Sequence, residues 1–210
     1  MFLTQILWSA YKLKGEHLRV DKMMQTMSSY RRRAIFREAS GYIELGELLV
    51  RPDEPVPRHA KKLLHRGLSA LEKLPESSRS RPNAQLLYGE ALRCLGRFED
   101  ALVSYTTVIQ VQPKQIEAWL GIGWCLKRMG RLHDAIQFLK KGLMASPKQP
   151  ILFYNLACYH SLDGNVNAAI EHLTQAIVLD DRFRNLTQIE PDFDPIRKDP
   201  RFQAATHIST

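Results

Sequence analysis

The chain contains few residue types that could do chemistry, and their spacing limits what they can do. Three cysteines, Cys94, Cys125 and Cys158, are an odd number with wide spacing and no CxxC pair. This pattern disfavours both a disulfide framework and a cysteine-based zinc site. It is typical of buried thiols in a reducing compartment, and we therefore expect a cytoplasmic protein.

Other signatures of catalysis or cofactor binding are also missing from the sequence. The seven histidines form no HExxH pair, and there is no P-loop motif. One GxG occurs, at Gly121 and Gly123, but it lies within a helical pattern and does not follow a strand. The acidic residues of 190–199 lack the spacing of a calcium loop. We therefore expect no enzyme: no catalytic residue, no cofactor and no metal.

Composition bounds the class of protein. The 210 residues are 44% apolar and 25% charged, which is the range of one globular domain. The net charge of +8 is uneven, at +7 over residues 1–81, +4 over 82–149 and −3 over 150–210, and its densest cluster is Arg31, Arg32, Arg33 and Arg37. No apolar run is long enough to span a bilayer, so we expect no integral membrane protein.

A repeat of 34 residues organises the middle and end of the chain. Six positions recur in three successive units, including the glycines Gly96, Gly130 and Gly164. Each unit predicts two helices with apolar stripes, the first ended by a glycine that can take a positive φ. Small residues such as Gly123 and Ala135 fall where the two helices must cross closely. Neither helix can bury its stripe alone, which predicts a stack of repeats.

The residues of the three units resemble the tetratricopeptide repeat of small bacterial proteins. The second unit shows this best, with Trp119, Ile122, Gly123, Leu126, Gly130, Leu132, Ala135, Leu139, Gly142 and Pro147 at the positions of the family pattern. Units at 82–115, 116–149 and 150–183 match in the same way. The resemblance implies an all-α fold, a right-handed α-solenoid of helix-turn-helix repeats. It also implies a non-enzymatic scaffold or adaptor that binds a peptide segment of a partner protein.

The remaining segments are assigned around these three repeats. Residues 32–76 look like a degenerate helical pair with an inserted, proline-rich loop at 51–58, and residues 1–31 form an N-terminal helix or extension. Residues 184–210 are expected to cap the last repeat, because a stack needs an end that tolerates water. Phe193, Ile196 and Phe202 can tuck back over the exposed end.

The family binds peptides along a concave groove lined by the first helix of each repeat. The resemblance places thirteen residues on or beside that groove: Asn83, Leu86, Glu90, Arg93, Glu117, Leu120, Trp124, Lys127, Arg128, Ile151, Tyr154, Cys158 and Ser161. Trp124 is either a binding anchor or a packed side chain. The family's clamp for a C-terminal carboxylate is absent. Arg93, Lys127 and Arg128 suggest a partner segment with apolar or aromatic side chains and acidic residues.

Two other functions and one assembly stay open as alternatives. The basic N-terminal half could bind nucleic acid, although stacking aromatics are missing beside the arginine cluster, which disfavours it. Residues 1–30 could form a helix on a membrane surface. The same helix could instead pack on the first repeat or make the protein a homodimer.

Overall fold

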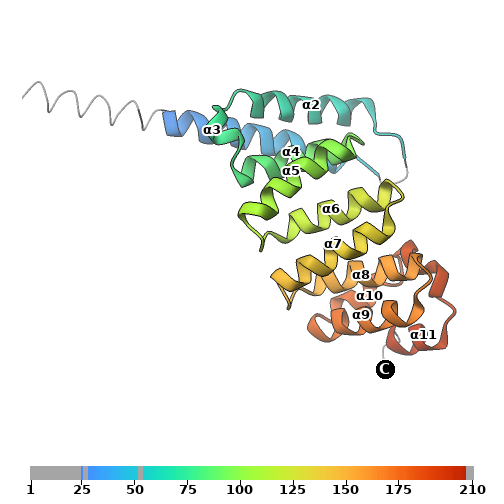
Figure 1. Ribbon diagram of the computed structural model, residues 1–210. Helices are drawn as coiled ribbons and strands as arrows, with labels where there is room; N and C mark the ends of the chain where they lie inside the picture. The colour runs from blue at the N-terminus through green and yellow to red at the C-terminus, as the bar shows by residue number, and fades with distance from the viewer. Residues whose placement is uncertain (1–24, 26–27, 52–53, 207–210) are drawn as a thin grey trace, which may run out of the picture.

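The computed structural model describes residue 25, residues 28–51 and residues 54–206, and all regular structure in these ranges is helical (Figure 1). A helix over residues 28–47 is followed by α2 (Arg58–Glu72) and the short α3 (Glu76–Arg79). Three pairs come next: α4 (Pro82–Cys94) and α5 (Phe98–Val111), α6 (Ile116–Arg128) and α7 (Leu132–Ala145), α8 (Pro150–Leu162) and α9 (Val166–Leu179). The chain ends with α10 (Arg182–Leu186), the 3-10 helix η1 (Pro191–Ile196) and α11 (Pro200–Thr206). The predicted all-α solenoid is confirmed.

The turns within the pairs repeat with the sequence. Gly96, Gly130 and Gly164 have φ values of 78°, 75° and 74°, in the left-handed region that favours glycine. After Gly130, the backbone N–H of Arg131 donates to the carbonyl of Leu126 at 2.8 Å, which satisfies one of the last carbonyls of α6. The predicted end of the first helix at Gly130 is therefore confirmed.

Close helix crossings explain the small residues of the repeat. Ala101, Ala135 and Ala169 are fully buried. A Cβ placed on Gly89 would lie 2.6 Å from the ring of Tyr105, which is itself fully buried. A larger side chain at Gly89 would therefore push α4 and α5 apart.

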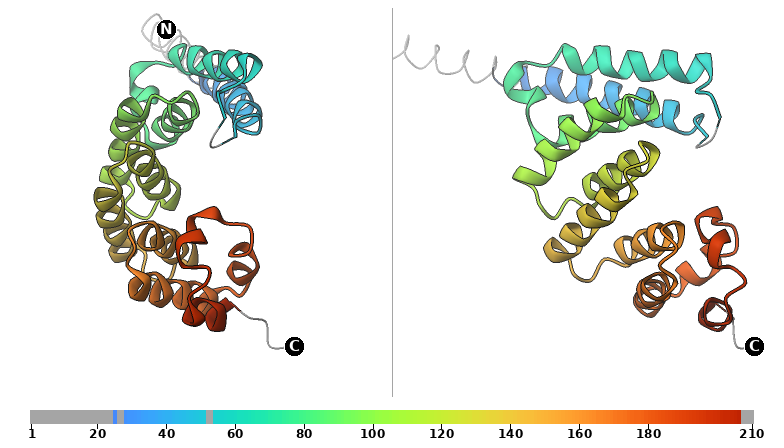
Figure 2. Two further views of the ribbon diagram at one scale, coloured as in Figure 1. Left: turned by 90° about the vertical axis from the view of Figure 1, so that its right-hand side faces the viewer. Right: turned by 45° about the vertical axis from the view of Figure 1, so that its right-hand side comes forward.

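The stacked pairs form an arc, with α4, α6 and α8 toward its inner side (Figure 2). The helix over residues 28–47 and α2 extend the stack before α4, while η1 turns back and packs against α8. Phe193, Ile196 and Phe202 are only 0%, 3% and 3% exposed, as their expected tucking requires. The C-terminal segment (residues 182–206) is thus part of the packed core.

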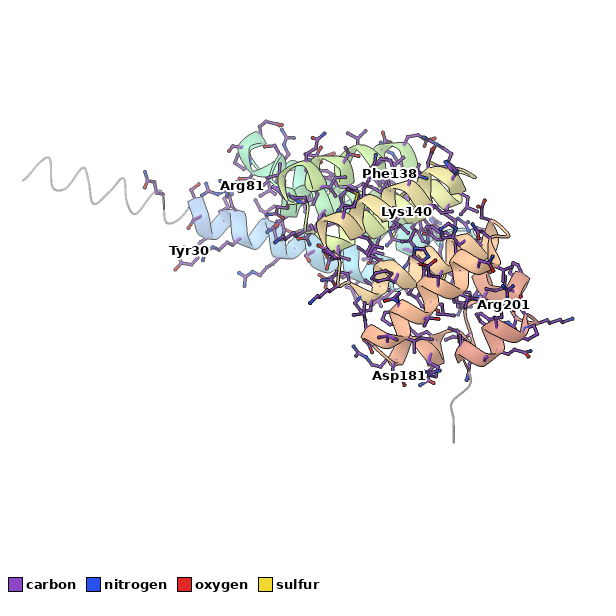
Figure 3. The ribbon with its side chains drawn as sticks, turned by 60° about the horizontal axis from the view of Figure 1, so that its bottom comes forward. Tyr30, Arg81, Phe138, Lys140, Asp181 and Arg201 are labelled. Carbon is purple, nitrogen blue, oxygen red and sulfur yellow. The ribbon has the colours of Figure 1, made fainter. Side chains whose placement is uncertain are left out.

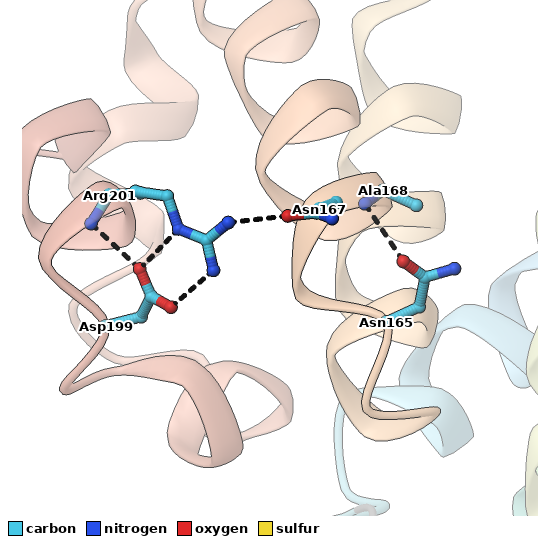
Figure 4. A network of polar contacts seen from close by, with 5 residues as sticks. All are labelled: Asn165, Asn167, Ala168, Asp199 and Arg201. Atoms are coloured by element: carbon cyan, nitrogen blue, oxygen red, sulfur yellow. Dashed lines mark hydrogen bonds and ion pairs between the residues drawn. The ribbon is translucent and has the colours of Figure 1, made fainter.

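Polar contacts tie the C-terminal segment to the start of α9 (Figure 4). Arg201 pairs with Asp199 at 2.8 Å and donates from Nη1 to the side-chain oxygen of Asn167 at 2.5 Å. Asn165 caps α9, since its Oδ1 accepts the backbone N–H of Ala168 at 3.2 Å. The hydrogen bond from Arg201 to Asn167 connects α11 to the last repeat.

The N-terminal part differs from the expected division. The helix over residues 28–47 runs across the boundary placed between residues 31 and 32. Residues 1–24 lie outside the described residues, and with them the expectations of a membrane-surface or dimerising helix. None of the described helices combines the length and the hydropathy needed to cross a bilayer.

Candidate peptide-binding groove

A hollow of about 460 Å³ opens on the inner side of the arc. Its apolar wall comes from Leu86 and Leu87 of α4 and from Leu120 and Trp124 of α6, all four half-buried. Leu120 and Trp124 share one face of α6 because they are four residues apart. The lining residues, which define the hollow, are Glu47, Leu86, Leu87, Glu90, Arg93, Glu117, Leu120, Gly121, Trp124 and Asn155. We call this hollow the inner groove.

Trp124 packs against other side chains of the chain and also lines the inner groove. Its ring packs edge-to-face on Phe98, with centroids 5.7 Å apart and planes at 76°. The guanidinium carbons of Arg93 and Arg128 lie 5.0 Å and 5.6 Å from its ring centroid. These contacts hold the indole in place while part of it still lines the inner groove. A rigid, half-exposed aromatic is a suitable anchor for a partner side chain.

The charge of the inner groove is mostly negative. Three carboxylates, Glu47, Glu90 and Glu117, line it together with one cation, Arg93. Arg93 pairs with Glu90 at 2.6 Å and also with Glu47, and its side chain is only 17% exposed. The one guanidinium of the inner groove is therefore already neutralised by the chain itself, and its second carboxylate partner comes from the helix over residues 28–47.

The C-terminal segment covers the groove positions expected in the third repeat. Phe193 of η1 packs on Tyr154, with ring centroids 5.5 Å apart. Tyr154, Cys158 and Ser161 are 6%, 3% and 0% exposed. Tyr154 therefore faces the chain's own C-terminal segment, and none of the three side chains is part of the open surface, which corrects their expected position in the groove.

Lys127 also interacts with the C-terminal segment. Its Nζ pairs with Asp192 of η1 at 2.6 Å and lies 5.5 Å from the ring centroid of Tyr159. The expected preference for acidic partners rested on Arg93, Lys127 and Arg128. The first two already hold carboxylates of this chain, so they add little attraction for acidic residues of a partner.

The other expected groove residues are distributed around the inner groove. Ile151 is half-buried and does not line it. Glu117 lies at its edge and accepts a hydrogen bond from Gln115 at 2.8 Å. Arg128 is exposed and lines a neighbouring hollow of about 290 Å³ with Trp124. Asn83 lies in a different hollow at the start of α4.

Five residues of this region are not among the thirteen expected groove residues. Glu47, Leu87, Gly121 and Asn155 line the inner groove, and Asp192 neutralises Lys127. Glu47 and Asp192 belong to segments outside the regular repeats, where the 34-residue register offers no guide to position. The acidic motif around Asp192 was visible, but its partner depends on the path of the C-terminal segment.

The described thiols are buried and lie outside any cluster of metal-ligating side chains. Cys94, Cys125 and Cys158 are buried. Burial raises the pKa of Cys94 to about 11 and that of Cys125 to about 12, and it also raises the pKa of Cys158 well above its ordinary value. The thiol form is therefore favoured at neutral pH. Within residues 28–51 and 54–206, no three His, Cys, Asp or Glu side chains converge as metal ligands would.

Comparison with known proteins identifies the repeat. Residues 92–157 match a family model described as tetratricopeptide repeat. No characterised protein sequence is significantly similar to the chain. Among solved structures, MamA from Desulfovibrio magneticus RS-1 is 17% identical with a TM-score of 0.51, over 80% of this chain and 89% of that one. A double mutant of MamA RS-1 gives 19% and 0.54, over 80% and 88%, and MamA MSR-1 gives 19% and 0.52, over 74% and 98%. These similarities support the fold.

Proposed function

We propose that the chain is a protein–protein interaction scaffold that binds a peptide segment of a partner in the inner groove, because residues 92–157 match the tetratricopeptide repeat and the described residues form a stack of helical pairs. The observation that carries this proposal is the apolar wall of Leu86, Leu87, Leu120 and Trp124, which the described part of the chain leaves half-exposed. Apolar surface of this kind is stabilised when a partner covers it.

The partner segment has an apolar or aromatic side chain flanked by basic residues. The apolar side chain fills the space between Leu86, Leu120 and Trp124. Lys or Arg next to it is favoured because Glu47, Glu90 and Glu117 outnumber Arg93. This proposal departs from the sequence-based expectation of acidic flanking residues, which the intramolecular pairs of Arg93 and Lys127 remove.

The scaffold acts without catalysing a reaction and works in the cytoplasm. Two observations support a role without catalysis. The described cysteines are buried and their raised pKa values favour the unreactive thiol form, and the inner groove is a hollow on the surface of the arc. The cytoplasmic location is supported by three buried cysteines that form no disulfide.

A peptide-display selection against the purified protein tests the inner groove. Enriched peptides should combine aromatic or branched apolar residues with Lys or Arg. Leu86→Ala and Leu120→Ala should each weaken their binding by about tenfold, because each removes one apolar contact of roughly 1–2 kcal/mol.

Val103→Ala is the matched control. Val103 is 68% exposed on α5, and losing its side chain should leave the affinity unchanged. Circular dichroism confirms that the variants stay folded. Peptides that bind equally well to wild type, Leu86→Ala and Leu120→Ala would place the binding surface elsewhere, and enrichment of acidic peptides would overturn the proposed partner chemistry.

A further inference from the structure

A second hollow, of about 490 Å³, lies between the start of the helix over residues 28–47, the α3 region and the start of α4. Figure 3 labels Arg81, which lines this hollow, and Tyr30, which lies at the start of the helix over residues 28–47. Its lining residues are Ser29, Arg32, Arg33, Phe36, Leu74, Ser78, Arg81, Pro82, Asn83, Ala84 and Gln112. We call it the arginine hollow. Three arginines, Arg32, Arg33 and Arg81, line it, and none of the described residues that line it is Asp or Glu.

The arginines of this hollow differ from those of the repeats. Arg93, Arg97 and Arg131 each pair with a carboxylate of the chain. Arg32 instead donates to the hydroxyl of Ser28 at 2.8 Å, and Arg81 donates from Nε to the carbonyl of Ser77 at 3.2 Å.

Within residues 28–51 and 54–206, neither Arg32, Arg33 nor Arg81 has a carboxylate partner. Three like charges gathered in one hollow repel one another, and a bound carboxylate would relieve this repulsion. The positive end of α4 adds to the potential, since its first turn, Pro82–Ala84, lines the hollow and contains no acidic residue.

The base of the hollow is apolar. Leu74 is 5% exposed and Phe36 is half-buried, and both line it beside Pro82. A ligand that pairs with the arginines and also packs on the apolar base therefore carries a negative charge close to an apolar group. Asp or Glu next to a Leu, Ile or Phe side chain has this combination.

The arrangement fits a protein segment better than nucleic acid. Consecutive residues of a helix point about 100° apart. Of the run Arg31, Arg32, Arg33 and Arg37, only Arg32 and Arg33 line the hollow. Nucleic acid repeats its charge every few ångströms along the strand and needs a continuous basic stripe, with aromatic platforms if it is single-stranded. The hollow supplies a small cluster of cations and one half-buried phenylalanine.

We propose that the arginine hollow is a second docking site, which takes an acidic protein segment containing an apolar side chain. The charge complementarity of Arg32, Arg33 and Arg81 selects the carboxylates, and Phe36 with Leu74 contacts the apolar group. The site is separate from the inner groove and opposite to it in charge.

Fluorescence anisotropy with defined probes tests the site. The binding probe is a labelled peptide that repeats the unit Glu-Asp-Leu-Phe, and the control probe replaces its acids by Gln and Asn. The wild-type protein should bind the acidic peptide and not the amide peptide, with an affinity that falls as salt is added. Arg33→Gln combined with Arg81→Gln should weaken binding by about tenfold or more, because the acidic peptide loses the charge-assisted hydrogen bonds of two guanidinium groups.

Arg31→Gln combined with Arg37→Gln is the matched control, since it removes the same net charge from exposed positions outside the hollow. It should change the affinity less than about twofold. Equal losses in the two double variants would show attraction by net charge alone and would overturn the site. So would binding of the amide peptide with equal affinity, no binding of the acidic peptide, or displacement of that peptide by oligo-dT at equal concentration.

Discussion

Replacing Phe193 by alanine should release the C-terminal segment locally and expose one particular thiol. Phe193 is fully buried, and its ring lies 5.5 Å from that of Tyr154 and 5.3 Å from that of Phe202. The segment that it anchors covers Cys158, which is 3% exposed. Without the phenyl ring, η1 loses its main apolar contact with α8.

The size of the effect follows from the burial. A fully buried Phe→Ala change costs about 3–5 kcal/mol. Detachment of the segment from α8 becomes more favourable by up to this amount. Since about 1.4 kcal/mol corresponds to a factor of ten, Cys158 should react up to about 10²- to 4 × 10³-fold faster.

The chemistry of the thiol strengthens the change. Burial, together with the nearby carboxylates of Glu190 and Asp192, raises the pKa of Cys158 in the folded protein. Detachment of the segment lets this pKa fall toward its ordinary value, which increases the thiolate fraction.

The assay is thiol labelling followed by peptide mass spectrometry, which separates the three cysteines. Cys158 should be labelled first in Phe193→Ala, with Cys94 and Cys125 still protected. Leu64→Ala is the control, because it removes a fully buried side chain from α2 at the other end of the solenoid. It should not expose Cys158 selectively. Equal labelling of all three thiols in Phe193→Ala, or no labelling, would refute the idea that η1 is a local cover.

The remaining predictions concern the pH dependence of stability and the packing of single helical positions. Burial, and then the nearby His172, lowers the pKa of His160, so the unfolded chain binds this proton more readily. Stability should fall as pH drops below about 6.5, and His160→Leu should flatten that decline in melting temperature. Gly121→Ala should cost about 1–3 kcal/mol in urea unfolding, because its Cβ would overlap Tyr105. Gly41→Ala should instead raise the free energy of unfolding by about 0.5–1 kcal/mol, because the new methyl group lies in open space on a helix.

Each of these predictions has an outcome that contradicts it. Leu92 and Leu126 fill the position of His160 in the other repeats, so leucine fits there. An unchanged pH dependence in His160→Leu would assign the decline to other groups. Destabilisation of similar size in Gly121→Ala and Gly41→Ala would point to glycine removal in general, with no role for the ring of Tyr105.

The regular part of the fold could be predicted because its determinants are local. The apolar stripes, the turn glycines and the small crossing residues all lie within one repeat, and the 34-residue register aligns them. Some of the residues that line the inner groove could also be predicted. Leu86, Leu120 and Trp124 line it at the positions that the resemblance to the tetratricopeptide repeat implied. Glu47 could not be placed, because it lies in the degenerate N-terminal pair.

The sequence alone determined that the protein is a stack of helical pairs with an inner face and a tucked C-terminal end. The tertiary structure decided which part of that face stays open and what charge it carries. Phe193 covers Tyr154, and Asp192 neutralises Lys127 across 65 positions of sequence. Such contacts depend on the path of an irregular segment through space. Repeat periodicity describes which way a side chain faces on its own helix, but it does not predict which residues of a distant segment will contact that side chain.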